Sequence, residues 1–313
     1  MVQRIVLFVL AGSFGCGGAG PPGDGSSSTG LDPSSTVAPE TSDASSGSSS
    51  TSGGAGSTGD PETGSTTGIT RSDLGSVGPG PLRVAVISDL NGSYGSTEYQ
   101  ASVHAGVAEV IARAPDLVLS TGDMVAGQQA GLDYAAMWAG FHAAVTDPLT
   151  AAGLPFAITP GNHDASGYPA FVAERELFVQ QWQARKPALD YLDDSAYPLR
   201  YSFFAGPALF VALDDTTVGP LDDEQMGWLG DQLAQGDDHP TKIVFGHLPL
   251  WPFAQGREDE VIGDVALEEL LVLHGVDLFV SGHHHAYFPG RRGDLRLAGT
   301  ACLGAGPRAL IGV

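Results

Sequence analysis

Cysteine and positive charge are scarce in this chain. It has two cysteines, and 14 Lys and Arg against 36 Asp and Glu, for a formal net charge of −22. If Cys16 serves as a lipid anchor, no intramolecular disulfide remains, and we interpret Cys302 as a small buried residue rather than a catalytic thiol. The acidic balance argues against a surface that binds nucleic acid or an anionic membrane. The N-terminal apolar run, Ile5–Leu10, is too short to span a bilayer.

The first 80 residues contain little that can form a core. Residues 17–80 are nearly all Gly, Ser, Thr, Pro and Asp, which predicts a disordered tether. Residues 1–16, MVQRIVLFVLAGSFGC, combine one Arg, a short apolar run and small residues, which indicates a secretory signal. The segment resembles a bacterial lipoprotein signal, in which Cys16 would be lipidated; cleavage as an ordinary secreted protein is the alternative. We therefore expect the cell envelope (periplasm or outer membrane) or secretion, with membrane contact only through Cys16.

Residues 81–313 are large enough for one domain with a single core. This part has 29 acidic and 12 basic side chains, a formal charge of −17. Short runs rich in Val, Ile, Leu and Phe alternate with helix-length stretches, which predicts an α/β fold whose sheet is covered on both faces. The predicted strands are RVAVIS, DLVLS, PFAIT, ALFVALD, KIVFG and DLFVSG, and the predicted helices lie within 97–113, 130–145, 169–183, 222–235 and 264–274.

Side chains that bind metals recur where these strands end. In α/β proteins, the crevice beyond the carboxyl ends of the strands is where sites form, so five strand ends would direct polar groups to one region. A lone His or Asp at a strand end is more often structural, but five such ends are hard to explain by chance. The residues are Asp89, Asn91, Asp123, Asn162, His163, Asp164, His247, His283, His284 and His285.

This set consists of imidazoles, carboxylates and amides, without a thiolate, which makes a structural zinc site a poor explanation. It contains more ligands than one four-coordinate ion needs. It fits two metal ions that share a bridging carboxylate. Two divalent ions would also give the site a net positive charge, which attracts a phosphoryl group despite the acidic surface.

The ordered motifs D-x-N, GD, GNHD, GH and GHHH resemble those of the calcineurin-like metallophosphoesterases. The resemblance implies a two-sheet β-sandwich flanked by helices, a four-layer α/β/β/α fold. It also implies a dinuclear centre of Mn, Fe, Zn or Mg and hydrolysis of a small phosphoester by a metal-bound hydroxide. By position, Asp123 would bridge both ions, and the remaining ligands would be Asp89 and His285 for the first ion and Asn162, His247 and His283 for the second.

The same resemblance assigns roles around the metals. His163 would stand beside the leaving-group oxygen, oriented by Asp164, and His284 would face away from the ions. Arg308 is a candidate phosphate contact, although a solvated Arg near the C-terminus explains it equally well. We expect a monomer whose partner is the small phosphoester substrate.

Asn91 departs from the family pattern, which places a His there. An amide oxygen is a harder ligand than imidazole, so the first ion would be held more weakly, with a preference for Mn²⁺, Mg²⁺ or iron over zinc. The alternative function is a tethered binding lipoprotein of the same fold that holds metal or phosphate and turns over slowly. The retained GNHD and GHHH motifs favour the enzyme.

Overall fold

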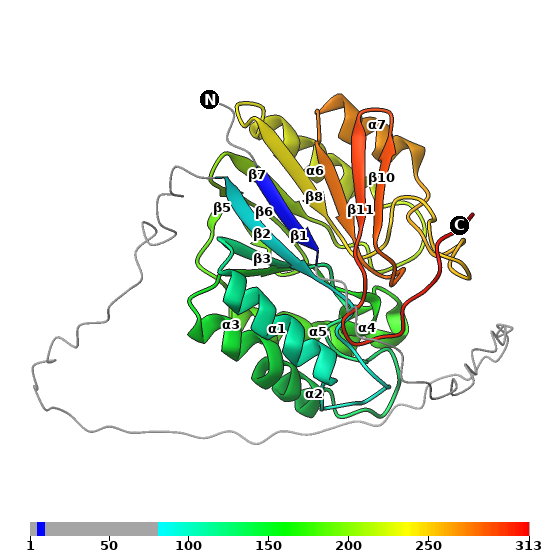
Figure 1. Cartoon of the computed structure of the whole chain (residues 1–313). Coiled ribbons are helices and arrows are strands. Elements are labelled where there is room, and N and C mark those ends of the chain that lie inside the picture. Colours follow the sequence, from blue (N-terminus) through cyan, green and yellow to red (C-terminus); the bar gives the residue numbers. More distant parts are fainter. Residues whose placement is uncertain (1–4, 10–80, 313) are drawn as a thin grey trace, which may run out of the picture. The chain divides into compact units, whose positions relative to one another are not determined.

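The structure of this chain, a computed structural model, describes residues 5–9 and 81–312 (Figure 1). The predicted tether (17–80) and Cys16 lie outside the described residues. Two sheets face each other and carry helices on their outer sides, so the predicted α/β/β/α sandwich is confirmed. No helix among the described residues is long and apolar enough to cross a membrane.

The first sheet has the order β1-β2-β3-β4, and all its strands are parallel. Three of its four strands, β2, β3 and β4, are predicted ones. The added edge strand is the apolar run of the predicted signal peptide, paired with β2 from Ile5↔Leu82 to Val9↔Val86. The signal peptide itself stays a prediction. The strands are β1 (Ile5–Val9), β2 (Leu82–Ile87), β3 (Leu117–Ser120) and β4 (Phe156–Ile158).

The second sheet has the order β10-β11-β9-β8-β7-β6-β5 and is mixed. Strands β7, β8, β9 and β11 are parallel, whereas β5, β6 and β10 are antiparallel to their neighbours. The bounds are β5 (Asp190–Ala196), β6 (Arg200–Ala205), β7 (Ala208–Ala212), β8 (Thr241–Phe245), β9 (Leu278–Ser281), β10 (Phe288–Arg292) and β11 (Leu295–Gly299).

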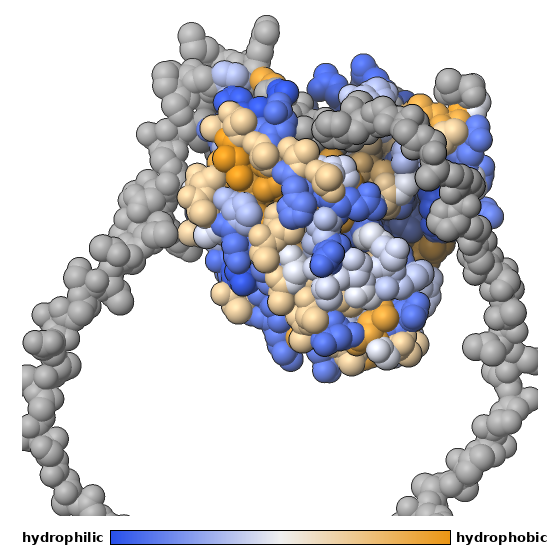
Figure 2. Space-filling model, turned by 60° about the horizontal axis from the view of Figure 1, so that its bottom comes forward, coloured by the Kyte–Doolittle hydropathy of each residue, from blue (hydrophilic) through white to orange (hydrophobic). Residues whose placement is uncertain are grey.

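The helices form the two outer layers. α1 (Ala101–Arg113), α2 (Tyr134–Phe141), the π-helical η2 (His142–Thr146), α3 (Asp147–Ala151) and α5 (Val172–Ala184) cover the first sheet, with the single turns α4 (Asn162–Ala165) and η3 (Pro169–Phe171) nearby. α6 (Asp223–Gln235) and α7 (Val265–Leu273) cover the second sheet (Figure 1). From the side of the first helical layer, apolar side chains form small separate areas among polar ones (Figure 2).

Strand β7 shows how the two cores separate. Its alternate residues point to opposite faces of the sheet. Ala208, Phe210 and Ala212 pack into the core between the sheets and beneath α1, α2 and α5. Leu209 and Val211 pack into the second core under α6 and α7. Both faces are buried, which explains why the strand reads as a continuous apolar run.

The predicted helix start at Asp222 is confirmed, because its carboxylate accepts a hydrogen bond from the N–H of Gln225 at 2.7 Å. The Gln225 side chain does not return to the cap, however. It instead bonds the backbone of Asp214, donating to the C=O and accepting from the N–H. This contact ties α6 to the loop that follows β7, on the site side of the sheet.

Candidate metal centre

The backbone turns sharply where the candidate ligands leave their strands. Asp89, Asp123, His283 and His285 have φ values of 49°, 53°, 61° and 51°, in the left-handed region. Such a conformation costs a non-glycine residue roughly 1–2 kcal/mol. Four candidate ligands adopt this unfavourable conformation, so the backbone in this region holds a fixed geometry that lowers the stability of the fold.

Glycines of the motifs permit a close approach of two turns. A Cβ on Gly161 would lie 2.1 Å from the backbone nitrogen of Asp123 and 2.2 Å from its Oδ1. Gly122, with φ of +92°, faces Gly161 from the other turn. Only hydrogen atoms fit in this space, so the GD and GNHD motifs meet directly and bring Asn162 and His163 beside Asp123.

The first candidate metal group contains Asp89, Asp123 and His285, whose potential ligand atoms all lie within 4.8 Å of one another. His285 Nε2 is 3.2 Å from Asp89 Oδ1. Burial by itself would raise the pKa of Asp89, but the charge and hydrogen bond of His285 outweigh it and hold that pKa well below its usual range. Asp89 is therefore an anionic candidate ligand at neutral pH.

The second group contains Asp123, His247 and His283, again within 4.8 Å. His247 Nε2 lies 3.4 Å from Asp123 Oδ1, 2.9 Å from Asn162 Oδ1 and 3.1 Å from His283 Nδ1. His247 Nε2 thus lies within 3.4 Å of three other potential ligand atoms. Asp123 belongs to both groups, which is the arrangement that a bridging carboxylate requires.

Hydrogen bonds to the protein orient these imidazoles. The Nδ1 atoms of His247 and His285 face the carbonyl oxygens of Thr121 at 2.8 Å and Gly306 at 3.0 Å. A carbonyl only accepts, so in each ring the proton is placed on Nδ1 and the lone pair on Nε2, which faces the other ligands. His284 belongs to neither group; its Nε2 faces the backbone C=O of Glu260 and its ring packs on Phe253.

Asn91 is buried, and its side-chain Oδ1 has no hydrogen-bond partner. A buried acceptor without a partner is costly, so a missing ligand or water is expected there. The chemistry of this donor set fits two metal ions: buried carboxylate, amide and imidazole atoms converge, and one amide oxygen is left for a further bond. Six of the seven residues expected from the sequence lie within these contacts, and Asn91 is a candidate through its unpartnered Oδ1.

Asp164 does not orient the His163 ring, contrary to our expectation. The Asp164 carboxylate accepts hydrogen bonds from the N–H groups of Met124, Val125 and Gly161, at 2.7, 2.9 and 3.0 Å. Both residues lie in the helical turn α4, where adjacent side chains point in different directions. Asp164 instead braces the turn that carries Asp123. Burial, and then the Asp123 charge, raise the pKa of Asp164 to about 7.

His163 is held by other contacts. Its Nδ1 faces the C=O of Gly127 at 3.0 Å, and its backbone N–H donates to Asp123 Oδ1 at 3.0 Å. The half-exposed Tyr94 lies beside it, with ring centroids 5.4 Å apart. His163 is therefore next to the Asp123 carboxylate, with an aromatic ring at its side.

Arg308 and Cys302 line a cavity of about 430 Å³ together with His285. The Arg308 backbone N–H donates to the C=O of His285 at 3.2 Å. Burial raises the pKa of the Cys302 thiol to about 12, so it is not a nucleophile at neutral pH. The cavity opens beside the first metal group, which keeps Arg308 a candidate for contact with substrate.

Two residues that we did not select from the sequence contact the centre. Asp215 accepts a hydrogen bond from the N–H of His247 through Oδ1 at 2.7 Å, and Glu260 lies 2.8 Å from His283 Nε2. Asp215 follows its strand as the candidate ligands do, which is a signal that could have been used. Glu260 lies later in the loop that begins with the GH motif, in a stretch without a motif of its own, and nothing in the sequence distinguishes it.

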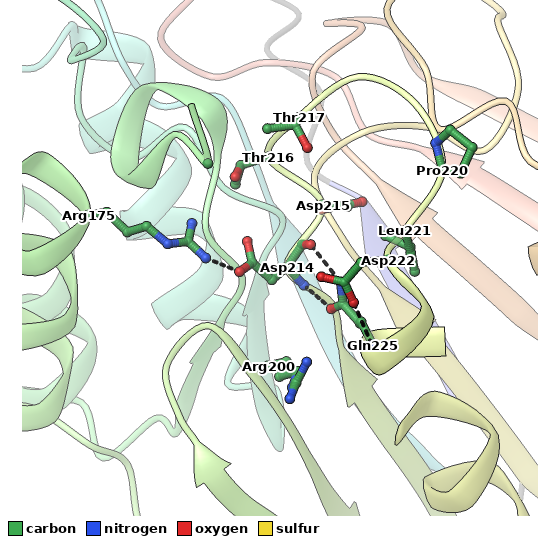
Figure 3. A pocket seen from close by; sticks show the side chains of 11 residues that line it. Arg175, Arg200, Asp214, Asp215, Thr216, Thr217, Pro220, Leu221, Asp222 and Gln225 are labelled. Carbon is green, nitrogen blue, oxygen red and sulfur yellow. Dashed lines mark hydrogen bonds and ion pairs between the residues drawn. The ribbon is translucent and has the colours of Figure 1, made fainter. Parts of the chain in front are cut away.

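Asp215 also lines a second, polar cavity of about 300 Å³ (Figure 3). Arg175 reaches into this region and pairs with Asp214, while Gln225 holds the Asp214 backbone. Burial raises the pKa of Asp215 to about 7, and its Oδ2 has no protein partner. The contact with His247 fixes the backbone of that ligand.

With this geometry established, comparisons with known proteins identify the family. A family model described as calcineurin-like phosphoesterase matches residues 82–287. The chain belongs to the calcineurin-like phosphoesterase family. That match extends over all seven candidate ligands and ends shortly after the GHHH motif.

Members of this family with known activity are similar to the chain over part of their length. Purple acid phosphatase 15 of Arabidopsis thaliana is 28% identical over 236 residues, covering 66% of this chain and 40% of that protein. Purple acid phosphatase 22 of the same plant is 29% identical over 212 residues, covering 66% and 45%. The chain thus spans less than half the length of these relatives.

Two solved phosphatases share the fold. A purple acid phosphatase from yellow lupin (Lupinus luteus) seeds has a TM-score of 0.54 and 18% identity, over 74% of this chain and 45% of that one. A dimetal phosphatase from Danio rerio has a TM-score of 0.51 and 16% identity, over 72% and 88%. A dinuclear metal centre is typical of the family, and the two groups around Asp123 are the candidate ligands for it here.

Proposed function

We propose that residues 81–313 form a metal-dependent hydrolase of small phosphoesters with a dinuclear centre. The observation that carries the proposal is that two groups of buried ligand atoms share Asp123, with His163 bonded to the same carboxylate. The first ion would be held by Asp89, His285 and the Oδ1 of Asn91. The second would be held by Asn162, His247 and His283.

When bound, the two ions would activate a water molecule and neutralise charge on the phosphoryl group. The protein residues then act on the leaving group. His163 directs Nδ1 to the C=O of Gly127, which places one proton on Nδ1, so donation to the departing oxygen would require a second proton on Nε2, in the imidazolium form. Asp164 holds the turns of the GD and GNHD motifs together, so its contribution is to position Asp123 and His163.

The donor sets suggest different metals at the two positions. The first set is rich in oxygen, which suits Mn²⁺, Mg²⁺ or iron, whereas the second has two imidazoles, which suit Zn²⁺ or iron as well. We also propose that the protein works as a monomer in the cell envelope, anchored through Cys16 or secreted. The acidic surface and the apolar run before Cys16 support this proposal.

Hydrolysis of p-nitrophenyl phosphate and its bis-ester tests this function, after reconstitution of the metal-free protein with Mn²⁺, Fe²⁺, Zn²⁺ or Mg²⁺. We expect two ions per chain and turnover. The Asn162→Ala variant should lose an ion and nearly all activity. His163→Ala should keep both ions while kcat falls by about 10²–10⁴.

His104→Ala is the matched control, because His104 is exposed on α1 and should leave activity unchanged. Two bound ions in a folded protein that hydrolyses neither ester with any of these metals would contradict the proposed enzyme. That result would favour the slow, tethered binding protein instead.

A further inference from the structure

The Glu260 side chain contacts one of the candidate histidine ligands through its carboxylate. Its Oε2 lies 2.8 Å from His283 Nε2, and it also pairs with Arg257. The Glu260 carbonyl oxygen lies 3.2 Å from His284 Nε2. One residue thus contacts two consecutive histidines of the GHHH turn, through its side chain and its backbone.

The three candidate histidine ligands do not have equivalent partners. His247 and His285 direct Nδ1 to neutral carbonyl oxygens, whereas His283 directs Nε2 to a carboxylate. The metal-facing atom of His283 is consequently Nδ1, which lies 3.1 Å from His247 Nε2. His283 therefore presents Nδ1 to the centre, where His247 and His285 present Nε2, and its other ring nitrogen contacts a charged group.

This contact decides where the His283 proton resides. A carboxylate only accepts hydrogen bonds, so it holds the proton on Nε2 and leaves the Nδ1 lone pair facing the second group. A carboxylate partner also makes a ligating imidazole more basic, and removal of such partners typically weakens metal affinity 10–100-fold. Arg257 pairs with the same oxygen, Oε2, and holds the carboxylate in place.

We propose that Glu260 is a positioning residue for the second ion: its carboxylate fixes the His283 tautomer and raises the affinity of the ion held by Asn162, His247 and His283. The inference rests on the proposed dinuclear centre, but it concerns metal binding and not turnover. It assigns a role to the part of the β8–α7 loop that follows the GH motif.

Metal affinity tests this role directly. Metal-free wild type, Glu260→Ala and Glu260→Gln would be titrated with Zn²⁺ and with Mn²⁺ in competition with a chelating indicator. In Glu260→Ala, we expect the affinity for one of the two ions to fall about 10–100-fold while that for the other changes less than about threefold. Glu260→Gln should retain part of the affinity, because its amide oxygen still accepts from Nε2 but carries no charge.

Two further measurements separate positioning from a general loss of structure. Glu258→Ala removes an exposed carboxylate from the same loop and should bind both ions like wild type. In metal-free protein labelled with ¹⁵N-histidine, long-range ¹H–¹⁵N spectra should show the His283 proton on Nε2 in wild type and a shift of the tautomer in Glu260→Ala. The melting temperatures of the metal-free variants should agree.

Wild-type affinity for both ions in Glu260→Ala would overturn the proposal. So would an equal loss at both ions accompanied by a lower melting temperature of the metal-free protein, because that pattern indicates a structural role. If Glu260→Ala selectively weakens one ion while wild type hydrolyses no phosphoester, the proposed enzyme fails and the assignment of Glu260 stands.

Discussion

At the scale of single residues, the centre is built by close contacts between turns, and most of its side chains have a second partner that holds them. Asp123 receives the His163 N–H, His247 is fixed at both its backbone and its ring, and Asp164 closes the GD and GNHD turns. Asn91 is the exception, because its Oδ1 has no partner. The residue most open to redesign is therefore the one that departs from the family pattern.

Asn91→His should restore an imidazole to the first metal group. We expect tighter binding of one ion, by about tenfold, and a shift in preference from Mn²⁺ towards Zn²⁺, because nitrogen is a softer ligand than an amide oxygen. Chelator competition with each metal measures both effects. Asn91→Ala is the matched control and should weaken the same ion. Unchanged stoichiometry and preference in both variants would mean that Asn91 is not a ligand.

At the scale of elements, strand ends deliver the ligands and helices bury the strands. The helical layer on the first sheet is organised around His142 at the start of η2. Its ring contacts Trp138, Phe141 and Trp182 edge-to-face or tilted, and it bonds Thr146 and Gln181. Burial lowers the pKa of His142 to about 4. Protonation of this ring would therefore place a charge inside the layer.

This burial makes the helical layer sensitive to acid. The His142 pKa is lower in the folded than in the unfolded protein, so its neutral form stabilises the fold fully above about pH 6.5. That contribution is lost as the pH falls from about 6.5 to 4. We expect His142→Gln to show a free energy of unfolding that falls less between pH 7 and 4.5 than in wild type, by about 2 kcal/mol.

Urea denaturation of the metal-free protein at several pH values measures this difference. His104→Gln is the control, since that side chain is exposed on α1 and its replacement should leave the pH dependence of wild type intact. If the free energy of unfolding falls equally with decreasing pH in wild type and His142→Gln, His142 is not the acid-sensitive group.

At the scale of the whole molecule, we ask whether the domain needs the edge strand β1 in order to fold. Its five residues pair with β2. Each net hydrogen bond contributes about 0.5–1.5 kcal/mol, and ordering each residue costs about 1–2 kcal/mol. These terms nearly cancel, so a shortened chain that begins at Gly80 should fold, with a melting temperature within about 5 °C of the full chain.

Differential scanning calorimetry and metal stoichiometry of the two chains test this expectation. The shortened chain should still bind two ions, because every candidate ligand lies after residue 81. Failure of the shortened chain to fold would show that residues 5–9 belong to the domain and are not merely a leader that occupies an open edge.

The sequence alone determined the parts that depend on local pattern. Doubly buried strands read as apolar runs, and the ligand types at their ends indicated the fold and the candidate centre. It did not reveal β5, β6, β10 and β11: β5 and β10 are half-exposed, and the predicted runs include none of the four. The roles of Asp164 and Glu260 also needed the tertiary structure. The partners of the Asp164 carboxylate and the approach of Glu260 to His283 are set by packing in three dimensions, which no local pattern encodes.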